Sequence, residues 1–185
     1  MAKEEAVAPT VCLDSVFETA TINAKECRKV VTIDIPGAFL HANNDNYMIM
    51  RMNGTCTELM VKTDPKLYQK YIALGKGRQV LYLRLQKALY GMMKSALLFY
   101  RKLVGELHEM GFELNPYNPC VANKMVDGAQ LTVRWHVDNQ MISHINNNAI
   151  MAFIKAIKAI YGDNLAESMG RKHNYLGMEF DYLSV

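Results

Sequence analysis

Two carboxylates occupy positions where an acid is hard to explain unless it has a partner. Asp34 comes near the end of KVVTIDI, residues 29–35, a nearly continuous β-branched run that predicts a strand buried on both faces. Asp138 lies in LTVRWHVDNQMISH, residues 131–144, between two strand-like runs. A buried carboxylate is costly unless it is paired or bound to a metal ion. Carboxylates are preferred Mg²⁺ ligands, and two such ions about 4 Å apart promote in-line phosphoryl displacement. The pair therefore suggests nucleotidyl transfer.

The residues around Asp138 predict a hairpin with the acid at its tip. Side chains alternate along a strand, so Arg134, His136 and Asp138 would share one face. We expect the turn at Asp138-Asn139 and a return strand from Met141 to Ile145 that holds it rigidly. If this hairpin pairs beside the strand that ends in Asp34, both acids lie at one edge of a sheet.

A simpler interpretation exists for each acid. Asp-Asn is good turn chemistry without any catalytic role. Asp34 could cap the single helical turn expected at residues 38–41, after Pro36-Gly37 ends the strand.

The remaining pattern predicts helices and strands that together form an α+β fold. Asp64-Pro65 is typical of a helix start, Gly111 of a helix end, and Asp127-Gly128 of a hairpin turn. We expect a buried helical stripe at Leu97, Tyr100, Val104 and Leu107. The predicted helices are 11–24, 65–73, 95–110 and 149–161, and the further strands are 47–52, 79–85, 118–125, 129–137 and 175–182. The architecture expected from this order is an antiparallel sheet with helices packed on one face.

Composition limits the class of protein. A chain of 185 residues that is 50% hydrophobic fits one globular domain, or one domain with a small appendage. The four cysteines show no Cys-x-x-Cys pair, so neither a zinc site nor a disulfide framework is indicated. No apolar run approaches the roughly 20 residues that span a bilayer, so we expect no membrane partner and an intracellular location.

Basic residues concentrate in the middle of the chain. Between residues 60 and 105 there are ten Lys or Arg and one acid, Asp64, and five tyrosines are interleaved with them. Such a stripe suits phosphate contact and base stacking, although an ordinary solvated face would look the same. The basic residues are Lys62, Lys66, Lys70, Lys76, Arg78, Arg84, Lys87, Lys94, Arg101 and Lys102.

Four ordered segments resemble motifs of the reverse transcriptase of copia-type retrotransposons. They are DIPGAFLHA (34–42), KALYGMMKSALLFY (87–100), WHVDN (135–139) and NYLGMEFDY (174–182), and the likeness spans roughly residue 9 to the end. The resemblance implies a polymerase-palm-like domain over residues 29–185, preceded by a tail and abbreviated fingers over residues 1–28, with no thumb. It also implies RNA-directed DNA synthesis with two Mg²⁺ ions, Mn²⁺ being a substitute, on an RNA or DNA template-primer with deoxynucleoside triphosphates.

Roles transfer only where residues agree. Asp34 and Asp138 resemble the metal-binding catalytic acids, with Asn139 beside them. The segments similar to the nucleotide-binding elements contain Ala38 and Phe39 in the first and Tyr90, Gly91 and Ser95 in the second, and Phe39 would exclude a ribose 2′-hydroxyl by its bulk. The strand with Tyr175, Leu176 and Gly177 is similar to the primer grip, and Lys87, Lys94 and Arg101 would contact the nucleic-acid backbone through their charge.

Departures from the family pattern bear on activity. The family turn carries two acids, and Asn139 replaces the second, so the site loses one of three negative charges. His136 stands where Tyr is usual, and Met93 and Ala96 stand where Lys and Pro are usual. We expect the palm core of a larger polyprotein, weak or inactive alone. The alternatives are a non-catalytic nucleic-acid-binding remnant and a two-metal nucleotide cyclase. Expected locations are the cytoplasm, including virus-like particles, and the nucleus.

Overall fold

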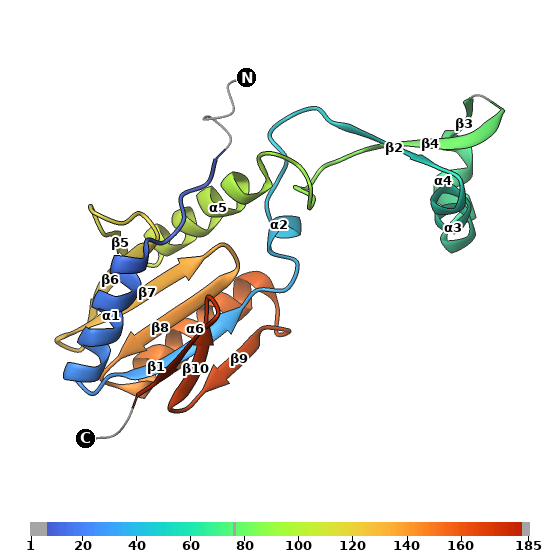
Figure 1. Cartoon of the computed structure of the whole chain (residues 1–185). Coiled ribbons are helices and arrows are strands. Elements are labelled where there is room, and N and C mark those ends of the chain that lie inside the picture. Colours follow the sequence, from blue (N-terminus) through green and yellow to red (C-terminus); the bar gives the residue numbers. More distant parts are fainter. Residues whose placement is uncertain (1–6, 76, 183–185) are drawn as a thin grey trace.

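An antiparallel sheet of six strands forms the centre of the chain, which the computed structural model describes over residues 7–75 and 77–182 (Figure 1). Its spatial order is β5-β6-β7-β8-β1-β9, and every pairing is antiparallel. The strands are β1 Lys29–Asp34, β5 Glu113–Leu114, β6 Val121–Val126, β7 Ala129–His136, β8 Asn139–His144 and β9 Ala166–Met169. This order places the strand that ends in Asp34 directly beside the hairpin that carries Asp138.

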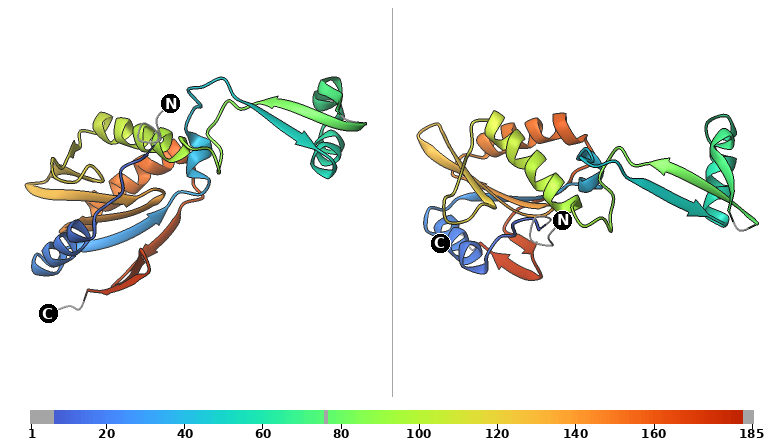
Figure 2. Two further views of the ribbon diagram at one scale, coloured as in Figure 1. Left: turned by 45° about the horizontal axis from the view of Figure 1, so that its top comes forward. Right: turned by 90° about the horizontal axis from the view of Figure 1, so that it is seen from above.

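Two long helices cover one face of the sheet, and a shorter helix crosses the other (Figure 2). The long helices are α5 Ser95–Glu109 and α6 Asn147–Tyr161, and the shorter one is α1 Leu13–Lys25. Apolar side chains of the sheet and of both long helices form one buried cluster, which includes Ile33, Val133, Ile142, Leu103 and Ile157. The predicted α+β fold, with helices packed on one face of an antiparallel sheet, is confirmed.

The buried stripe of α5 differs from the predicted one. Leu97 and Leu107 are buried as expected, but Phe99 and Leu103 are buried in place of Tyr100 and Val104, which are only half-buried. The helix is therefore rotated relative to the predicted stripe, because several residue sets on one helix satisfy a spacing of three and four.

A smaller sheet projects away from the main one (Figures 1 and 2). Its three strands are in the order β2-β4-β3 and carry helices on one end. The elements are α2 Ala38–His41, which leads into it, then β2 Ile49–Asn53, α3 Thr55–Thr63, α4 Pro65–Tyr68, η2 Gln69–Tyr71, β3 Ile72–Gly75 and β4 Arg78–Arg84. Where the chain leaves and re-enters the main body, Asn43 and Lys87 form an isolated bridge.

Two predictions in this projection were wrong. Helix α3 was not predicted, because a run with three threonines and a cysteine has weak helix propensity and follows a glycine. The helix predicted over 65–73 ends early, and β3 occupies its last residues. Its start is confirmed, since Asp64 accepts a hydrogen bond from the Leu67 N–H at 3.0 Å.

The last predicted strand is in fact a hairpin. Residues 175–182 do not form one strand: β10 Lys172–Tyr175 turns back at Leu176-Gly177 and pairs with β11 Met178–Asp181. Leu176 and Gly177 both have positive φ, at 53° and 75°, as in a type I′ turn. The sequence pattern misled because Leu is an unusual residue at a positive-φ position, so the apolar run looked continuous. The hairpin forms its own two-stranded sheet.

None of the helices in the described parts of the chain is long and apolar enough to cross a membrane.

Acid is expected to weaken the docking of this hairpin. His173 is buried, and burial lowers its pKa below the ordinary 6.5. As the pH falls below 6.5 the unfolded chain takes up the proton first, so the stability contributed by neutral His173 is present above that pH and lost below it. Thermal unfolding between about pH 7.5 and about pH 5 should show a smaller acid-induced loss for His173→Phe than for the unmodified chain. The exposed His108→Phe is the matched control, and equal pH slopes for all three proteins would contradict the expectation.

Candidate active site

Strand pairing in the six-stranded sheet brings the turn that contains Asp138 to the end of β1, where Asp34 lies. Asp34 is the direct partner of Asn139 in the β1–β8 pair, and Asn139 in turn is the partner of His136 in the β7–β8 pair. Directly opposed residues of antiparallel strands share a face, so these three side chains lie on one face of the sheet. The Ile35 N–H donates to the Asp138 carbonyl oxygen at 3.3 Å, which extends the contact to the turn. Asp34, Asp138 and Asn139 therefore come together at one edge.

The turn lies one residue earlier than predicted. The hairpin loop is Val137-Asp138, flanked by the His136–Asn139 pair, and Asn139 begins β8. Only Val137 of these two has positive φ, at 56°, which is the pattern of a type II′ turn. Asp138 thus lies inside the turn, where its carboxylate is half-buried, and Asn139 is exposed. The turn was expected at Asp138-Asn139 because Asp and Asn are common turn residues. Instead, the strand pairing leaves a two-residue loop, and this loop falls on Val137 and Asp138.

Val137 carries backbone strain that glycine would relieve. A β-branched residue at positive φ costs roughly 1 to 3 kcal/mol, while glycine adopts this conformation freely. Val137→Gly is expected to raise the free energy of unfolding by up to about 1 kcal/mol, because part of the gain is offset by the entropy of the unfolded chain. Val137→Ala, which keeps a Cβ, should be less stable than Val137→Gly in denaturant unfolding. The reverse order would show that the Val137 side chain, rather than its backbone, dominates.

The two acids of this edge oppose each other electrostatically. Burial raises the pKa of Asp34, and the charge of Asp138 raises it further. No Lys, Arg or His of residues 7–75 and 77–182 forms an ion pair with either carboxylate. The fold therefore holds two acids near each other without neutralising them.

A divalent cation fits this donor set. Mg²⁺ is usually bound by one or two carboxylates and completes its shell with water and phosphate oxygens. Asp34 and Asp138 supply two carboxylates, and the exposed amide oxygen of Asn139 is a neutral third donor. Among the described residues no cluster of three or more His, Cys, Asp or Glu side chains could hold a metal ion.

The predicted nucleotide-binding residues come from the segment that follows β1 and from the segment that leads into α5. The Phe39 ring lies 4.6 Å from the Tyr90 ring, measured between centroids, so the segment after β1 meets the LYG segment. Gly91 has a φ of +91°, a conformation that favours glycine. Ala38 is fully buried, and the buried Ser95 hydroxyl donates to the Leu89 carbonyl oxygen at 2.5 Å. Ala38 and Ser95 thus support the backbone of the site, while Phe39 and Tyr90 present the rings.

The predicted primer-contact residues lie around the turn of the β10–β11 hairpin. Leu176 and Gly177 form the exposed turn. Tyr175 is buried, and burial raises its pKa to about 12. Tyr175 therefore faces the main sheet, and the turn residues are the ones that a ligand can reach.

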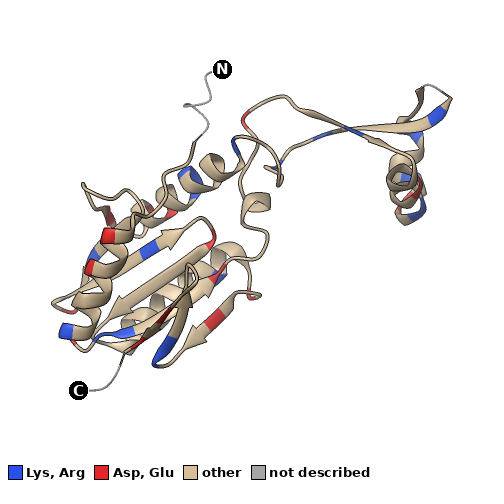
Figure 3. Cartoon of the chain, in the orientation of Figure 1, with Lys and Arg blue, Asp and Glu red and all other residues tan. Residues whose placement is uncertain are grey.

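The basic residues do not form one continuous stripe. They are divided between the projecting sheet and α5, as Figure 3 shows, and Lys76 lies outside the described residues. Lys87 donates to the Asn43 Oδ1 atom at 2.8 Å, and Lys94 lies 3.6 Å from the Asp45 carboxylate. Arg101 is exposed on α5. The charge of Lys87 and Lys94 is thus partly used to hold the junction between the two sheets.

Sequence reasoning missed the role of Arg134. It is 1% exposed in the middle of β7, on the same face as Asp34 by strand alternation. The signal was present in the sequence, since an arginine inside an apolar strand needs partners, but its partners are distant in the chain.

Comparison with known proteins identifies the family. The family model described as "Reverse transcriptase (RNA-dependent DNA polymerase)" matches residues 2–183. Among solved structures the chain is similar to apo telomerase from Candida tropicalis truncated from its C-terminal domain, at 10% identity and a TM-score of 0.47. The match covers 98% of this chain but only 40% of that chain. No curated protein sequence matches the chain. Because the family model covers nearly the whole sequence, the chain belongs to the reverse transcriptase family.

Proposed function

We propose that this chain is the reverse transcriptase domain of a copia-type retrotransposon polyprotein, with a palm-like part over residues 29–185. Its reaction is RNA-directed DNA synthesis by two-metal nucleotidyl transfer. The observation that carries the proposal is the pairing of Asp34 with Asn139, which sets the unneutralised Asp138 carboxylate beside that of Asp34. The order of the four copia-like segments along the chain supports the copia-type assignment.

Each residue of the site has a physical task in this reaction. Asp34 and Asp138 would hold the divalent cations, which when bound stabilise the attacking and leaving oxygens of the displacement. The Phe39 ring, which packs against Tyr90, would exclude a 2′-hydroxyl by its bulk. The Leu176-Gly177 turn would hold the primer strand, and exposed Arg101 would contact phosphates.

Asn139 limits the expected activity of the chain. An amide oxygen coordinates a cation but contributes no charge, so the site attracts two divalent ions less strongly than one with three carboxylates. We therefore expect weak primer extension from the unmodified chain. A non-catalytic nucleic-acid-binding remnant is the second candidate, favoured by the same missing charge.

Three assays on the purified chain separate the candidates. Primer extension on an RNA template with Mg²⁺ or Mn²⁺ is expected to be weak and to vanish in Asp34→Ala. A binding remnant would show template-primer affinity that declines with salt but no extension, even after Asn139→Asp. A cyclase would release pyrophosphate from nucleotides without any template. Extension that persists in Asp34→Ala would contradict the proposed site.

A further inference from the structure

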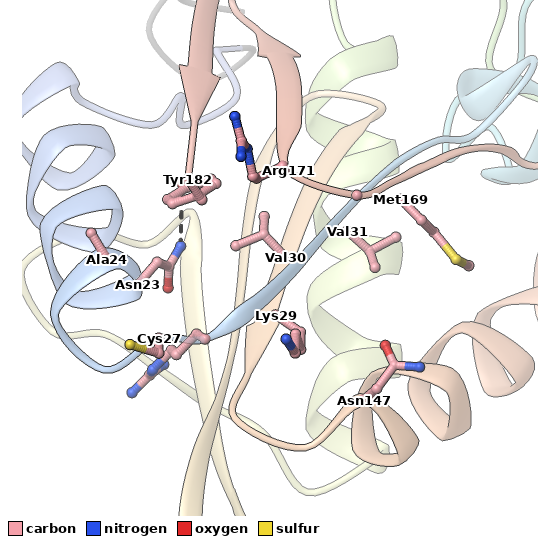
Figure 4. A pocket seen from close by; sticks show the side chains of 12 residues that line it. Asn23, Ala24, Cys27, Lys29, Val30, Val31, Asn147, Met169, Arg171 and Tyr182 are labelled. Carbon is pink, nitrogen blue, oxygen red and sulfur yellow. Dashed lines mark hydrogen bonds between the residues drawn. The ribbon is translucent and has the colours of Figure 1, made fainter. Parts of the chain in front are cut away.

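The β10–β11 hairpin packs on the main sheet through its side chains. It forms a separate two-stranded sheet and is not hydrogen-bonded into the six-stranded ladder. A cavity of about 450 Å³ lies at its root, between α1, the start of β1 and the β9–β10 turn, as Figure 4 shows. With no ladder hydrogen bonds to the main sheet, the hairpin is held by side chains: Tyr175 belongs to the buried core, and Met178, Phe180 and Tyr182 pack against it.

A buried guanidinium provides the central attachment. Arg134 donates from Nη1 to the Val16 carbonyl oxygen of α1 at 2.7 Å and to the Thr19 hydroxyl, and from Nη2 to the Met141 sulfur of β8 at 2.8 Å. The guanidinium carbon also lies 4.7 Å from the centroid of the Tyr175 ring, at the end of β10. One side chain of β7 thus joins α1, β8 and the hairpin.

This arrangement is not an ordinary ion pair. In the parts of the chain that the structure describes, no carboxylate lies within ion-pair distance of Arg134. A buried cation without a counter-ion is costly, and burial lowers the pKa of the Arg134 guanidinium. An apolar residue would pack this site at lower cost, so the charge is better explained by the geometry it imposes.

The contacts of Arg134 link the β7–β8 hairpin, which carries Asp138, to the β10–β11 hairpin, which would hold a primer. Arg134 lies in the same hairpin as Asp138, and Tyr175 directly precedes the exposed Leu176-Gly177 turn. The guanidinium is planar and stacks on an aromatic face while its N–H groups point to fixed acceptors. Its contacts therefore set the position of the primer-side turn relative to the catalytic acids.

We propose that Arg134 is a positioning residue that fixes the β10–β11 hairpin against the catalytic sheet. A second, weaker attachment supports it: the Asn23 side-chain amide donates to the Tyr182 hydroxyl at 3.5 Å, beside the cavity (Figure 4). The consequence for primer binding rests on the proposed function, whereas the attachment of the hairpin does not.

Hydrogen exchange on the full chain tests the attachment directly. Arg134→Met replaces the cation with an apolar side chain of similar length and is expected to unfold cooperatively at an unchanged or higher temperature. Amides of residues 172–181 should then exchange at least about tenfold faster, while those of α6 keep their rates. Arg171→Met is the matched control, because it removes an exposed charge of the same hairpin, paired with Asp181 at 3.0 Å, and leaves Tyr175 in place.

Two milder variants keep the test valid if Arg134→Met does not fold. Arg134→Lys retains a cation near the Tyr175 ring but loses the planar fork, so it should show intermediate exchange rates. Thr19→Val removes one acceptor and should show a smaller increase. Unchanged exchange of residues 172–181 in all three folded variants would overturn the proposal.

Nucleic-acid binding measurements distinguish a failure of this proposal from a failure of the proposed function. Arg134→Met is expected to weaken affinity for a recessed primer-template about tenfold, a change of 1.4 kcal/mol, and to leave affinity for a single strand unchanged. If the hairpin amides exchange faster but primer-template affinity is not selectively lost, Arg134 still attaches the hairpin. The hairpin would then not be a contact for the primer. Equal loss for both nucleic acids would show that Arg134 affects binding by a route other than the primer-side turn.

Discussion

Asp34→Asn is expected to abolish nucleotide incorporation and, in the same protein, to raise the melting temperature measured without metal. The amide removes one of the two carboxylates that would hold the catalytic cations, so incorporation should fall by at least about a hundredfold. Stability should rise because the pKa of Asp34 is raised by burial and by the charge of Asp138. The fold therefore penalises the ionised form, and an uncharged amide of the same shape escapes the penalty.

The sign of the pH dependence makes this expectation specific. A carboxyl whose folded pKa lies above the ordinary 3.8 destabilises the fold at every pH where it is ionised, and the penalty disappears as the pH falls through the folded pKa toward 3.8. The difference in melting temperature between Asp34→Asn and the unmodified chain should therefore be largest near neutral pH and shrink in acid. Added Mg²⁺ should stabilise the unmodified chain and not the variant, because a ligand that binds only the folded state stabilises it and the variant lacks one of the two proposed ligands.

A control substitution shows whether the increase in melting temperature is specific to Asp34. Asp163→Asn removes an exposed carboxylate just after α6 and makes the same change in charge. It should alter neither the melting temperature nor the response to Mg²⁺. If Asp34→Asn melts at a lower temperature than the unmodified chain, Asp34 stabilises the fold through contacts, and the interpretation of a strained catalytic acid is wrong.

Local patterns in the sequence predicted the elements that carry the site. The β-branched run to Asp34 is β1, the Asp127-Gly128 turn joins β6 to β7, and Gly162 ends α6 as such residues usually do. Each signal lies within a few neighbouring residues, so it can be interpreted without knowing the tertiary structure. The α+β architecture followed from the order of these elements.

The features that sequence reasoning missed depend on residues far apart in the chain. The turn at Val137-Asp138 is set by the pairing of β8 with both β1 and β7, which forces positive φ on a valine. The partners of Arg134 come from α1 and β10, so no local pattern could identify them. The two-residue turn at Leu176 likewise lacks the Asn or Asp that would have revealed it.

Asn139→Asp is expected to raise primer extension at least about tenfold and to lower the stability of the metal-free chain. Asn139 is exposed, pairs directly with Asp34 and follows Asp138, so the new carboxylate would join the other two on one edge. Charges about 5 Å apart interact by roughly 1 to 3 kcal/mol for effective dielectric constants between about 80 and 20. Without metal this interaction is repulsive, and with a divalent cation bound the same charges become attractive ligands.

Two further variants isolate the charge at this position as the cause. Asn139→Ala removes the amide without adding a charge and should not raise extension. Asn148→Asp adds a carboxylate to the exposed first turn of α6 and should leave both Mg²⁺ affinity and extension unchanged. Calorimetry with Mg²⁺ and primer extension on the same preparations measure the two effects separately. If Asn139→Asp binds Mg²⁺ more tightly but extends primers no better, the missing charge weakens metal binding without being what limits synthesis, and the cause lies in how the primer end is held.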